Sequence, residues 1–281
     1  MNYFETLKFG SHKLKSNNIN THILDSELLL SYVLKLSREQ VLVNLDRNMY
    51  KSKFNLFRKL LSRRERKEPI AYIINKKEFW KNNFYINRNV LIPRPETEII
   101  VEEVLNIIKT NSSKNILEIG TGSGCIIISI LKERVNCFAT AIDISKKAIN
   151  IAKFNAKMHH LSNKINLKNI DIDKIHYNKY DFIISNPPYI KKFNISRLDE
   201  SVKFFEPYIA LEAGIDGLRE IKKIIIKSNE LLKKNGKLIF EIGDNQVMVV
   251  KKILNQNGYY IEKVINDISS IPRVIISTKI N

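Results

Sequence analysis

The chain has 281 residues, of which 44% are hydrophobic, and a formal net charge of +18. This length fits one large domain or a large and a small one, and the composition is typical of a globular protein. The longest apolar run, 125–131, is too short to span a bilayer, and the N-terminus lacks the apolar core of a signal peptide. With two cysteines in the chain, we expect a cytoplasmic protein without disulfide bonds and without a membrane partner.

The excess of basic residues has two interpretations. Lys and Arg number 47 against 29 Asp and Glu, which would suit an RNA or ribosome-associated partner. A chain rich in Lys, Asn and Ile would acquire the same charge by composition, and the lysines are scattered rather than gathered in one tract. We favour the compositional interpretation. The five histidines form no HExxH motif and accompany no CxxC motif, so we expect no catalytic metal.

Residues 1–75 have the pattern of a small helical domain. Apolar residues recur at helical spacing after Asp25, Ser37 and Ser52, and each of these polar residues can begin a helix. The third of these helices should stop before Pro69, because the residue before a proline avoids helical backbone angles. We therefore predict a bundle of about three short helices.

Residues 76–92 are expected to link this bundle to a larger domain at 93–281. Apolar and polar residues alternate here with several aromatics, which predicts a short β-hairpin. Beyond it, Pro95 can occupy the first turn of a helix, whose N-terminus suits the acidic Glu96 and Glu98.

From residue 114 the chain alternates between strands and helices. Strands are predicted at 115–120, 136–143, 164–171, 180–186 and 236–243. Helices are predicted at 123–133, 145–160, 216–235 and 244–257, with Asp216 capping the third and Gly236 ending it. Two final strands, 258–267 and 272–280, should pair antiparallel at the sheet edge. This order predicts an α/β fold with a mostly parallel seven-stranded sheet, helices on both faces and ligands at the carboxyl ends of the strands.

A glycine-rich loop follows the first strand of this sheet. Three of the chain's nine glycines, Gly120, Gly122 and Gly124, lie within five positions, and backbone can approach a ligand closely where no Cβ intervenes. A dinucleotide fingerprint needs G-x-G-x-x-G, but here the third glycine comes one residue early. The E-x-G-x-G-x-G form starting at Glu118 resembles the first motif of class I S-adenosylmethionine-dependent methyltransferases. That resemblance implies a Rossmann-like fold and a loop that binds S-adenosylmethionine through Gly120, Thr121, Gly122, Ser123 and Gly124.

Two acidic residues end the next strands. Asp143 follows the glycine loop by about twenty residues, and its carboxylate can accept both hydroxyls of a ribose. Asp171 stands where the adenine edge of the cofactor would lie, with Ile172 beside it as an apolar wall. Similar enzymes often have an aromatic residue in place of Ile172. A solvent-exposed loop aspartate is the alternative interpretation of Asp171.

The sequence Asn186-Pro187-Pro188-Tyr189 follows the apolar residues of the fourth strand. An amide nitrogen is a poor nucleophile because its lone pair is shared with the carbonyl. A site that methylates it must hold the NH2 group with acceptors, and the Asn186 side-chain oxygen and the Pro187 carbonyl can accept. The prolines stiffen that carbonyl, and Tyr189 can lie flat against a planar group. The tetrapeptide therefore predicts methylation of an amino nitrogen without an acid–base pair.

Several enzyme groups share this tetrapeptide, including adenine-N6 DNA, guanine-N2 RNA and protein-glutamine methyltransferases. The order of six separate motifs discriminates among them: EPIAYI at 68–73, EFW at 78–80, LIPRPETE at 91–98, NPPYI at 186–190, FEPYIAL at 205–211 and GIDGL at 214–218. Over about residues 25–280, the chain resembles the release factor glutamine methyltransferase family. A sister family that methylates a ribosomal protein is also similar, but typically lacks the RPETE form at 93–98.

The resemblance implies transfer of a methyl group from S-adenosylmethionine to the glutamine of the Gly-Gly-Gln motif in class I peptide chain release factors. The helical domain would grip the release factor, and nucleic acid would not be required. Asn186 would border the cofactor and, with Pro187, Pro188 and Tyr189, hold the glutamine. Glu206 and Pro207 would belong to a substrate loop and Arg94 to the interdomain junction, unless Arg94 and Glu206 form a structural salt bridge. Leu91 departs from the aromatic residue that similar proteins often carry.

The main alternative is a nucleic-acid amino methyltransferase of the same fold. The charge of +18 would suit such an enzyme. It would need base-reading loops with aromatic or basic residues, and the helical N-terminal region has no evident one.

Overall fold

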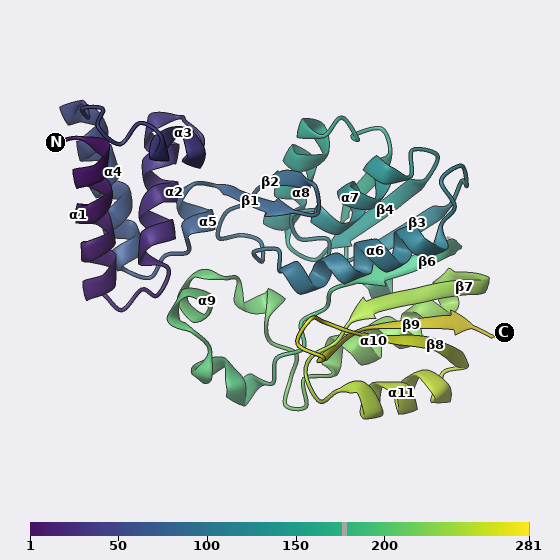
Figure 1. Cartoon of the computed structure of the whole chain (residues 1–281). Helices are drawn as coiled ribbons and strands as arrows, with labels where there is room; N and C mark the ends of the chain where they lie inside the picture. Colours follow the sequence, from purple (N-terminus) through teal and green to yellow (C-terminus); the bar gives the residue numbers. More distant parts are fainter. Residues whose placement is uncertain (176–178, 281) are drawn as a thin grey trace. The chain divides into compact units, whose positions relative to one another are not determined.

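The computed structural model describes residues 1–175 and 179–280. The chain divides into two compact units, Met1–Lys76 with Asp199–Phe205, and Lys77–Leu198 with Glu206–Asn281. Figure 1 shows helices throughout the first unit and a large sheet flanked by helices in the second. Each unit has a hydrophobic core of its own.

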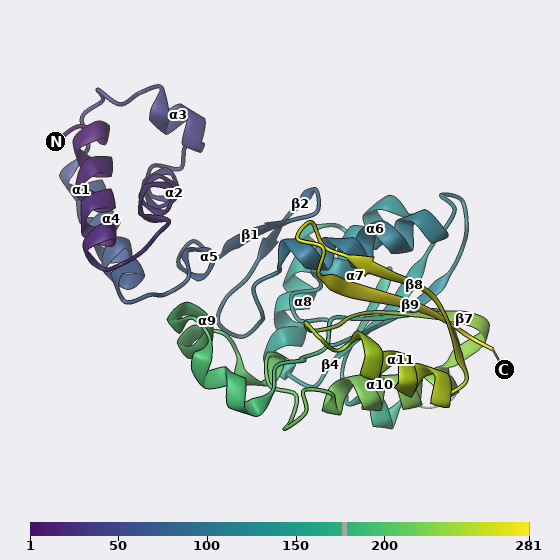
Figure 2. The ribbon, with the colours of Figure 1, turned by 60° about the horizontal axis from the view of Figure 1, so that its bottom comes forward.

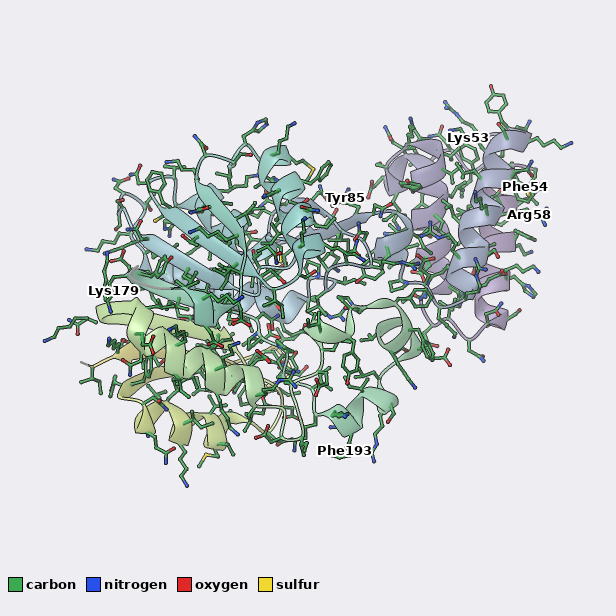
Figure 3. All side chains as sticks on the ribbon, turned by 180° about the vertical axis from the view of Figure 1, so that it is seen from behind. Lys53, Phe54, Arg58, Tyr85, Lys179 and Phe193 are labelled. Atoms are coloured by element: carbon green, nitrogen blue, oxygen red, sulfur yellow. The ribbon has the colours of Figure 1, made fainter. Side chains whose placement is uncertain are left out.

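The first unit is a helical bundle, as predicted. Its helices are α1 (Tyr3–Ser16), α2 (His22–Leu34), α3 (Arg38–Leu42), α4 (Lys51–Glu65), α5 (Ile70–Ile73) and α9 (Glu200–Phe205). Leu14, Leu29 and Phe57 are fully buried between α1, α2 and α4. Phe54 lies on α4 between Lys53 and Arg58 (Figure 3), and its ring packs against Phe9 of α1 at a centroid distance of 5.8 Å.

Two of the three predicted helix starts in this unit need correction. Ser37 does cap α3, because its hydroxyl accepts a hydrogen bond from the Gln40 N–H at 3.2 Å. Helix α2 begins earlier than predicted, so Asp25 lies in its first turn, where it accepts from Arg64 Nε at 2.6 Å. An acidic residue in the first turn also suits the positive end of the helix dipole. Helix α4 begins one residue before Ser52.

The predicted hairpin is present at the start of the second unit. Strands β1 (Lys76–Phe79) and β2 (Asn82–Tyr85) form a two-stranded sheet, so the paired residues end well before residue 92. The rings of Phe79 and Phe84 are fully buried and lie 6.2 Å apart. The short helix η1 (Pro95–Thr97) starts on Pro95, as predicted, and leads into α6 (Glu98–Ile107).

The seven-stranded sheet of the second unit confirms the predicted fold class. In spatial order its strands are β5 (Ile165–Asn169), β4 (Phe138–Asp143), β3 (Asn115–Ile119), β6 (Tyr180–Ser185), β7 (Leu232–Glu241), β9 (Pro272–Lys279) and β8 (Tyr259–Asn266). The first five run parallel, and β9 pairs antiparallel with both β7 and β8, as predicted for the sheet edge.

Helices cover both faces of this sheet (Figure 2). On one face lie α6, α7 (Cys125–Glu133) and α8 (Lys146–Met158), and on the other α10 (Arg219–Leu231) and α11 (Val247–Gln256). Short helices η2 (Ile172–Lys174), η3 (Lys192–Arg197) and η4 (Tyr208–Ala210) complete the described elements. Within the described ranges, no helix combines the length and apolarity needed to cross a bilayer.

The helix predicted at 216–235 is shorter at both ends. Asp216 does not cap it: α10 begins at Arg219, and the Asp216 carboxylate accepts from the Leu218 N–H at 2.9 Å. Gly236 does not end it either, because β7 begins at Leu232 and contains the glycine. Leu232 pairs with Tyr180 of β6, and both side chains are buried. Sheet pairing thus extends the strand backwards over residues with a local helical pattern.

Candidate functional site

A cavity of about 310 Å³ lies in the second unit at the carboxyl ends of β3, β4 and β6. Most of residues 89–94, Pro207 with part of η4, and the start of α10 also line it. The strand order reverses between β3 and β6, so the cavity sits where ligands bind in open α/β sheets.

The glycine loop forms the floor of this cavity. Gly120 and Gly122 have φ angles of +71° and +55°, and a Cβ on either would meet no heavy atom within 4 Å. Both glycines therefore present bare backbone to open space, and their left-handed angles favour glycine. Thr121 and Ser123 line the cavity with them. Gly124, with φ +81°, is not among the lining residues and packs closely against Ile128 and Ala152 instead.

Asp143 ends β4 and is tied to the same loop. Its Oδ2 accepts from the Gly122 N–H at 2.9 Å and its Oδ1 from the Ser145 N–H at 2.8 Å. A carboxylate has about four acceptor positions, so two remain for the hydroxyls of a ligand. Burial raises the pKa of Asp143, although the two backbone donors oppose that shift.

Glu118 lies directly beneath the loop and was not predicted as a site residue. One carboxyl oxygen accepts from the Thr121 hydroxyl, while Oε1 is buried without a hydrogen-bond partner among the described residues. Burial raises the pKa of Glu118 to about 8. The first position of the E-x-G-x-G-x-G motif was the signal that could have identified it.

Asp171 and Ile172 lie where β5 gives way to η2, and both line the cavity. Ile172 is buried, as an apolar wall requires. Asp171 pairs with Lys223 of α10 at 2.7 Å. Partial burial raises the pKa of Asp171, but the hydrogen bonds from Lys223 and the Asp173 N–H, together with the charges of Lys223 and Lys174, outweigh it, so the net shift of the pKa is downward. Lys223 itself lines the cavity and carries no sequence signal that marks it.

The tetrapeptide 186–189 follows β6, and three of its four residues line the cavity. Asn186, Pro187 and Pro188 line the cavity. Tyr189 is not among the lining residues: its ring packs against the core, and its hydroxyl donates to Glu241 Oε1 at 3.1 Å. The Tyr189 carbonyl accepts from Gln246 Nε2 at 3.3 Å. Sequence reasoning missed Gln246, which also binds the Gly217 carbonyl at 3.0 Å.

The Asn186 side chain is held from behind by two further residues that sequence reasoning missed. Asn186 Nδ2 donates to the Thr97 hydroxyl at 2.9 Å, and that hydroxyl donates to Glu241 Oε2 at 2.6 Å. Thr97 belongs to the RPETE segment, but Glu241 at the end of β7 has no motif around it. One N–H of the Asn186 amide is used in this way, and its oxygen accepts from no described residue, so that oxygen can accept from a ligand.

Asn155 of α8 connects the hairpin to the glycine loop. Its fully buried amide nitrogen donates to the Tyr85 carbonyl and to the Ser123 carbonyl, each at 2.9 Å, and its oxygen accepts from the Tyr85 N–H at 2.8 Å. Tyr85 is labelled in Figure 3. The Asn155 side chain therefore holds the glycine loop in position relative to α8 and β2. No sequence motif marks Asn155.

Arg94 and Glu206 form the salt bridge that was the alternative to a substrate role. Arg94 Nη2 lies 2.5 Å from Glu206 Oε1, and Glu206 Oε2 accepts from the Ile92 N–H at 3.3 Å. Burial raises the pKa of Glu206, although the Arg94 guanidinium opposes it. Arg94 lines the cavity together with Leu91 and Pro207, so the bridge joins two segments at its rim.

The lining as a whole fits S-adenosylmethionine. Bare loop backbone at Gly120 and Gly122, a carboxylate with spare acceptors at Asp143 and the apolar wall of Ile172 meet in one cavity. Beneath the glycine loop lies the buried Glu118 oxygen, which has no hydrogen-bond partner among the described residues. These groups suit a ligand with ribose hydroxyls, a flat base and a positive charge. Among residues 1–175 and 179–280, no three His, Cys, Asp or Glu side chains are placed to hold a metal ion.

The two units match two different protein families. Residues 5–74 match the family described as the PrmC N-terminal domain. Residues 97–201 match the methyltransferase small domain. The fold resembles a methyltransferase from Pyrococcus furiosus in a crystal structure, with 18% identity and a TM-score of 0.53 over 70% of this chain and 89% of that one.

Similar proteins are found along nearly the full chain. A bifunctional methyltransferase of Rickettsia felis is 38% identical over 99% of this chain, which spans 58% of that protein's length. A release factor glutamine methyltransferase of Clostridium acetobutylicum is 35% identical, covering 95% of this chain and 94% of its own. Another release factor glutamine methyltransferase, from Buchnera aphidicola, is 37% identical, covering 97% of this chain and 98% of its own.

Proposed function

We propose, because this chain belongs to the release factor glutamine methyltransferase family, that it methylates peptide chain release factors with S-adenosylmethionine. The acceptor is the side-chain amide N5 of the glutamine in the Gly-Gly-Gln motif of class I release factors. The helical region 1–75 binds the release factor, and the hairpin region 76–92 links it to region 93–281. Region 93–281 binds the cofactor and catalyses the methyl transfer. The reaction takes place in the cytoplasm.

The observation that carries this proposal is the placement of Asn186 beside the glycine loop in one cavity. The Thr97 hydroxyl accepts a hydrogen bond from the Asn186 amide nitrogen, and the amide oxygen can accept from the NH2 group of a substrate. A substrate amide held this way keeps its nitrogen lone pair directed towards the cofactor side of the cavity.

S-adenosylmethionine supplies a methyl group on a positively charged sulfur. Gly120 and Gly122 would hold its methionine part, and Asp143 its ribose. Asn186 and the Pro187 carbonyl then orient the glutamine, which cannot be deprotonated at neutral pH. The glutamine nitrogen bonds to the methyl carbon as the bond from that carbon to sulfur breaks, a neutral thioether leaves, and the nitrogen then loses one proton to water. Holding reactants in the reacting geometry can supply about 7–11 kcal/mol in the best cases, so positioning carries the reaction without an acid–base pair.

The experiment that tests the proposal offers labelled S-adenosylmethionine with three acceptors together: a class I release factor, ribosomal protein and nucleic acid. We expect label on the release factor, and none when the glutamine of its Gly-Gly-Gln motif is replaced by asparagine. Asn186→Ala should abolish turnover while cofactor binding, measured by calorimetry, persists. Label on the nucleic acid and none on the release factor would refute the proposal.

A further inference from the structure

The amide of Asn186 has two ends of similar shape and opposite hydrogen-bonding character. Its oxygen accepts and its nitrogen donates. A substrate NH2 group can be held by the oxygen, whereas an amide turned by half a rotation would set donors against donors. The site therefore needs a device that determines which end faces the cavity.

Thr97 contacts the nitrogen end but cannot choose it alone. Asn186 Nδ2 lies 2.9 Å from Thr97 Oγ1, and the threonine is 2% exposed. A hydroxyl group can both donate and accept, so an isolated threonine would bind either end of the amide. What directs the amide must lie beyond Thr97.

Glu241 removes this freedom. Thr97 Oγ1 lies 2.6 Å from Glu241 Oε2, and the other carboxylate oxygen accepts from the Tyr189 hydroxyl at 3.1 Å. An ionised carboxylate has acceptors alone. The single hydroxyl proton of Thr97 is committed to Glu241, so the threonine oxygen can only accept from the Asn186 nitrogen.

We propose that Glu241 and Thr97 form a polarised hydrogen-bond chain that fixes the Asn186 amide with its oxygen towards the methyl acceptor. Both are positioning residues: Glu241 acts through Thr97, and Thr97 acts through Asn186. This inference rests on the proposed function, because the methylated nitrogen is what the Asn186 oxygen holds. It assigns a task to the threonine of the RPETE segment and to the glutamate at the end of β7.

The polarity of the chain depends on the charge of Glu241. Burial raises the pKa of Glu241, while the hydrogen bonds from Thr97 and Tyr189 and the charge of Arg273 on β9 oppose that shift, and Glu96 on η1 reinforces it. Since the pKa of Glu241 is raised, the ionised form disappears at a higher pH than for an exposed glutamate. We expect kcat to fall on the acid side as Glu241 takes up a proton.

The first test removes the hydroxyl in the middle of the chain. Thr97→Val leaves Asn186 and Glu241 without their shared partner, and we expect kcat to fall roughly 10- to 100-fold, as small misplacements do. The dissociation constant of the cofactor should change little. Thr97→Ser restores the hydroxyl and should restore most of kcat. Ser277→Ala is the control, because Ser277 of β9 is a buried hydroxyl residue that donates to the Leu238 carbonyl at 3.2 Å and does not line the cavity.

The second test removes the charge. Glu241→Gln can offer either end of its amide to Thr97, so both polarities become possible. We expect a lower kcat and loss of the acid limb from the pH profile of kcat. Three results would each contradict the proposed hydrogen-bond chain. They are a wild-type kcat in Thr97→Val, a kcat in Thr97→Ser as low as that in Thr97→Val, and an unchanged acid limb of the pH profile in Glu241→Gln. If the wild-type enzyme labels nucleic acid instead, the proposed function fails, and the same variants assayed on that acceptor still decide the inference.

Discussion

At the scale of single residues, the fold controls the protonation of Glu118. This carboxyl group is buried under the glycine loop, where one oxygen accepts from Thr121 and the other has no partner among the described residues. Burial raises its pKa to about 8, so the group is mostly neutral at pH 7 in the ligand-free protein. A neutral carboxyl is tolerated there, and a positively charged ligand would favour the ionised form.

We expect Glu118→Gln to change how stability depends on pH. In the unfolded chain Glu118 loses its proton near its ordinary pKa, whereas in the folded protein it keeps the proton up to about pH 8. The folded state thus binds more protons between these values, so its stability falls as pH rises, by at most about 1.4 kcal/mol per pH unit. We expect the free energy of unfolding, measured in urea between pH 5.5 and 7.5, to fall less steeply with pH in Glu118→Gln than in the wild type. The same substitution at the exposed Glu102 is the control, and equal slopes for wild type and Glu118→Gln would contradict the prediction.

At the scale of elements, the GIDGL turn before α10 is built against the tetrapeptide. Gly217 has φ +75°, and a Cβ there would lie 2.6 Å from the Tyr189 carbonyl oxygen and 3.0 Å from Gln246 Nε2. Gln246 bonds to both segments and also accepts from the Gly243 N–H at 2.8 Å. The glycine therefore permits a close approach that keeps the Asn186 segment in place.

Gly217→Ala should damage activity more than the backbone angle alone explains. Gly258 is a matched control, because its φ is also +75° while its added Cβ would approach only Asn229, at 3.9 Å. Gly258→Ala should cost about 1–2 kcal/mol from the left-handed conformation and leave kcat unchanged. Gly217→Ala should cost roughly 1–3 kcal/mol more, as overpacking does, and should lower kcat. Thermal unfolding and turnover measure both effects, and indistinguishable variants would show that the approach to Tyr189 has no consequence.

At the scale of the whole molecule, the charge of +18 concerns association rather than fold. Many of the basic residues form ion pairs in the described structure, including Arg94 with Glu206 and Lys223 with Asp171. Each pair cancels one positive and one negative charge, so the net charge of +18 remains.

We expect nucleic acid to bind the enzyme without specificity and without effect on methylation. A complex held by six or more phosphate contacts loses about 10³-fold or more in affinity between 50 and 200 mM salt. Filter binding with tRNA should show such a steep dependence, whereas the kcat for release factor should not change when tRNA is added near physiological salt. Stimulation of release factor methylation by tRNA would instead make the charge part of the function.

Much of this protein could be derived from its sequence because the signals are local. The strand and helix periodicity, the E-x-G-x-G-x-G loop, Asp143 and the Asn186 tetrapeptide each lie within a few residues and predict the fold class and the chemistry. Thr97, Glu241, Gln246 and Asn155 could not be found this way. Thr97 and Glu241 are 144 residues apart in the chain, and their contact exists because η1 and α6, which follow one another in the chain, pack beside the end of β7. Local backbone preferences and spacing specify the elements and the reacting groups, whereas long-range packing decides what holds those groups and which way they point.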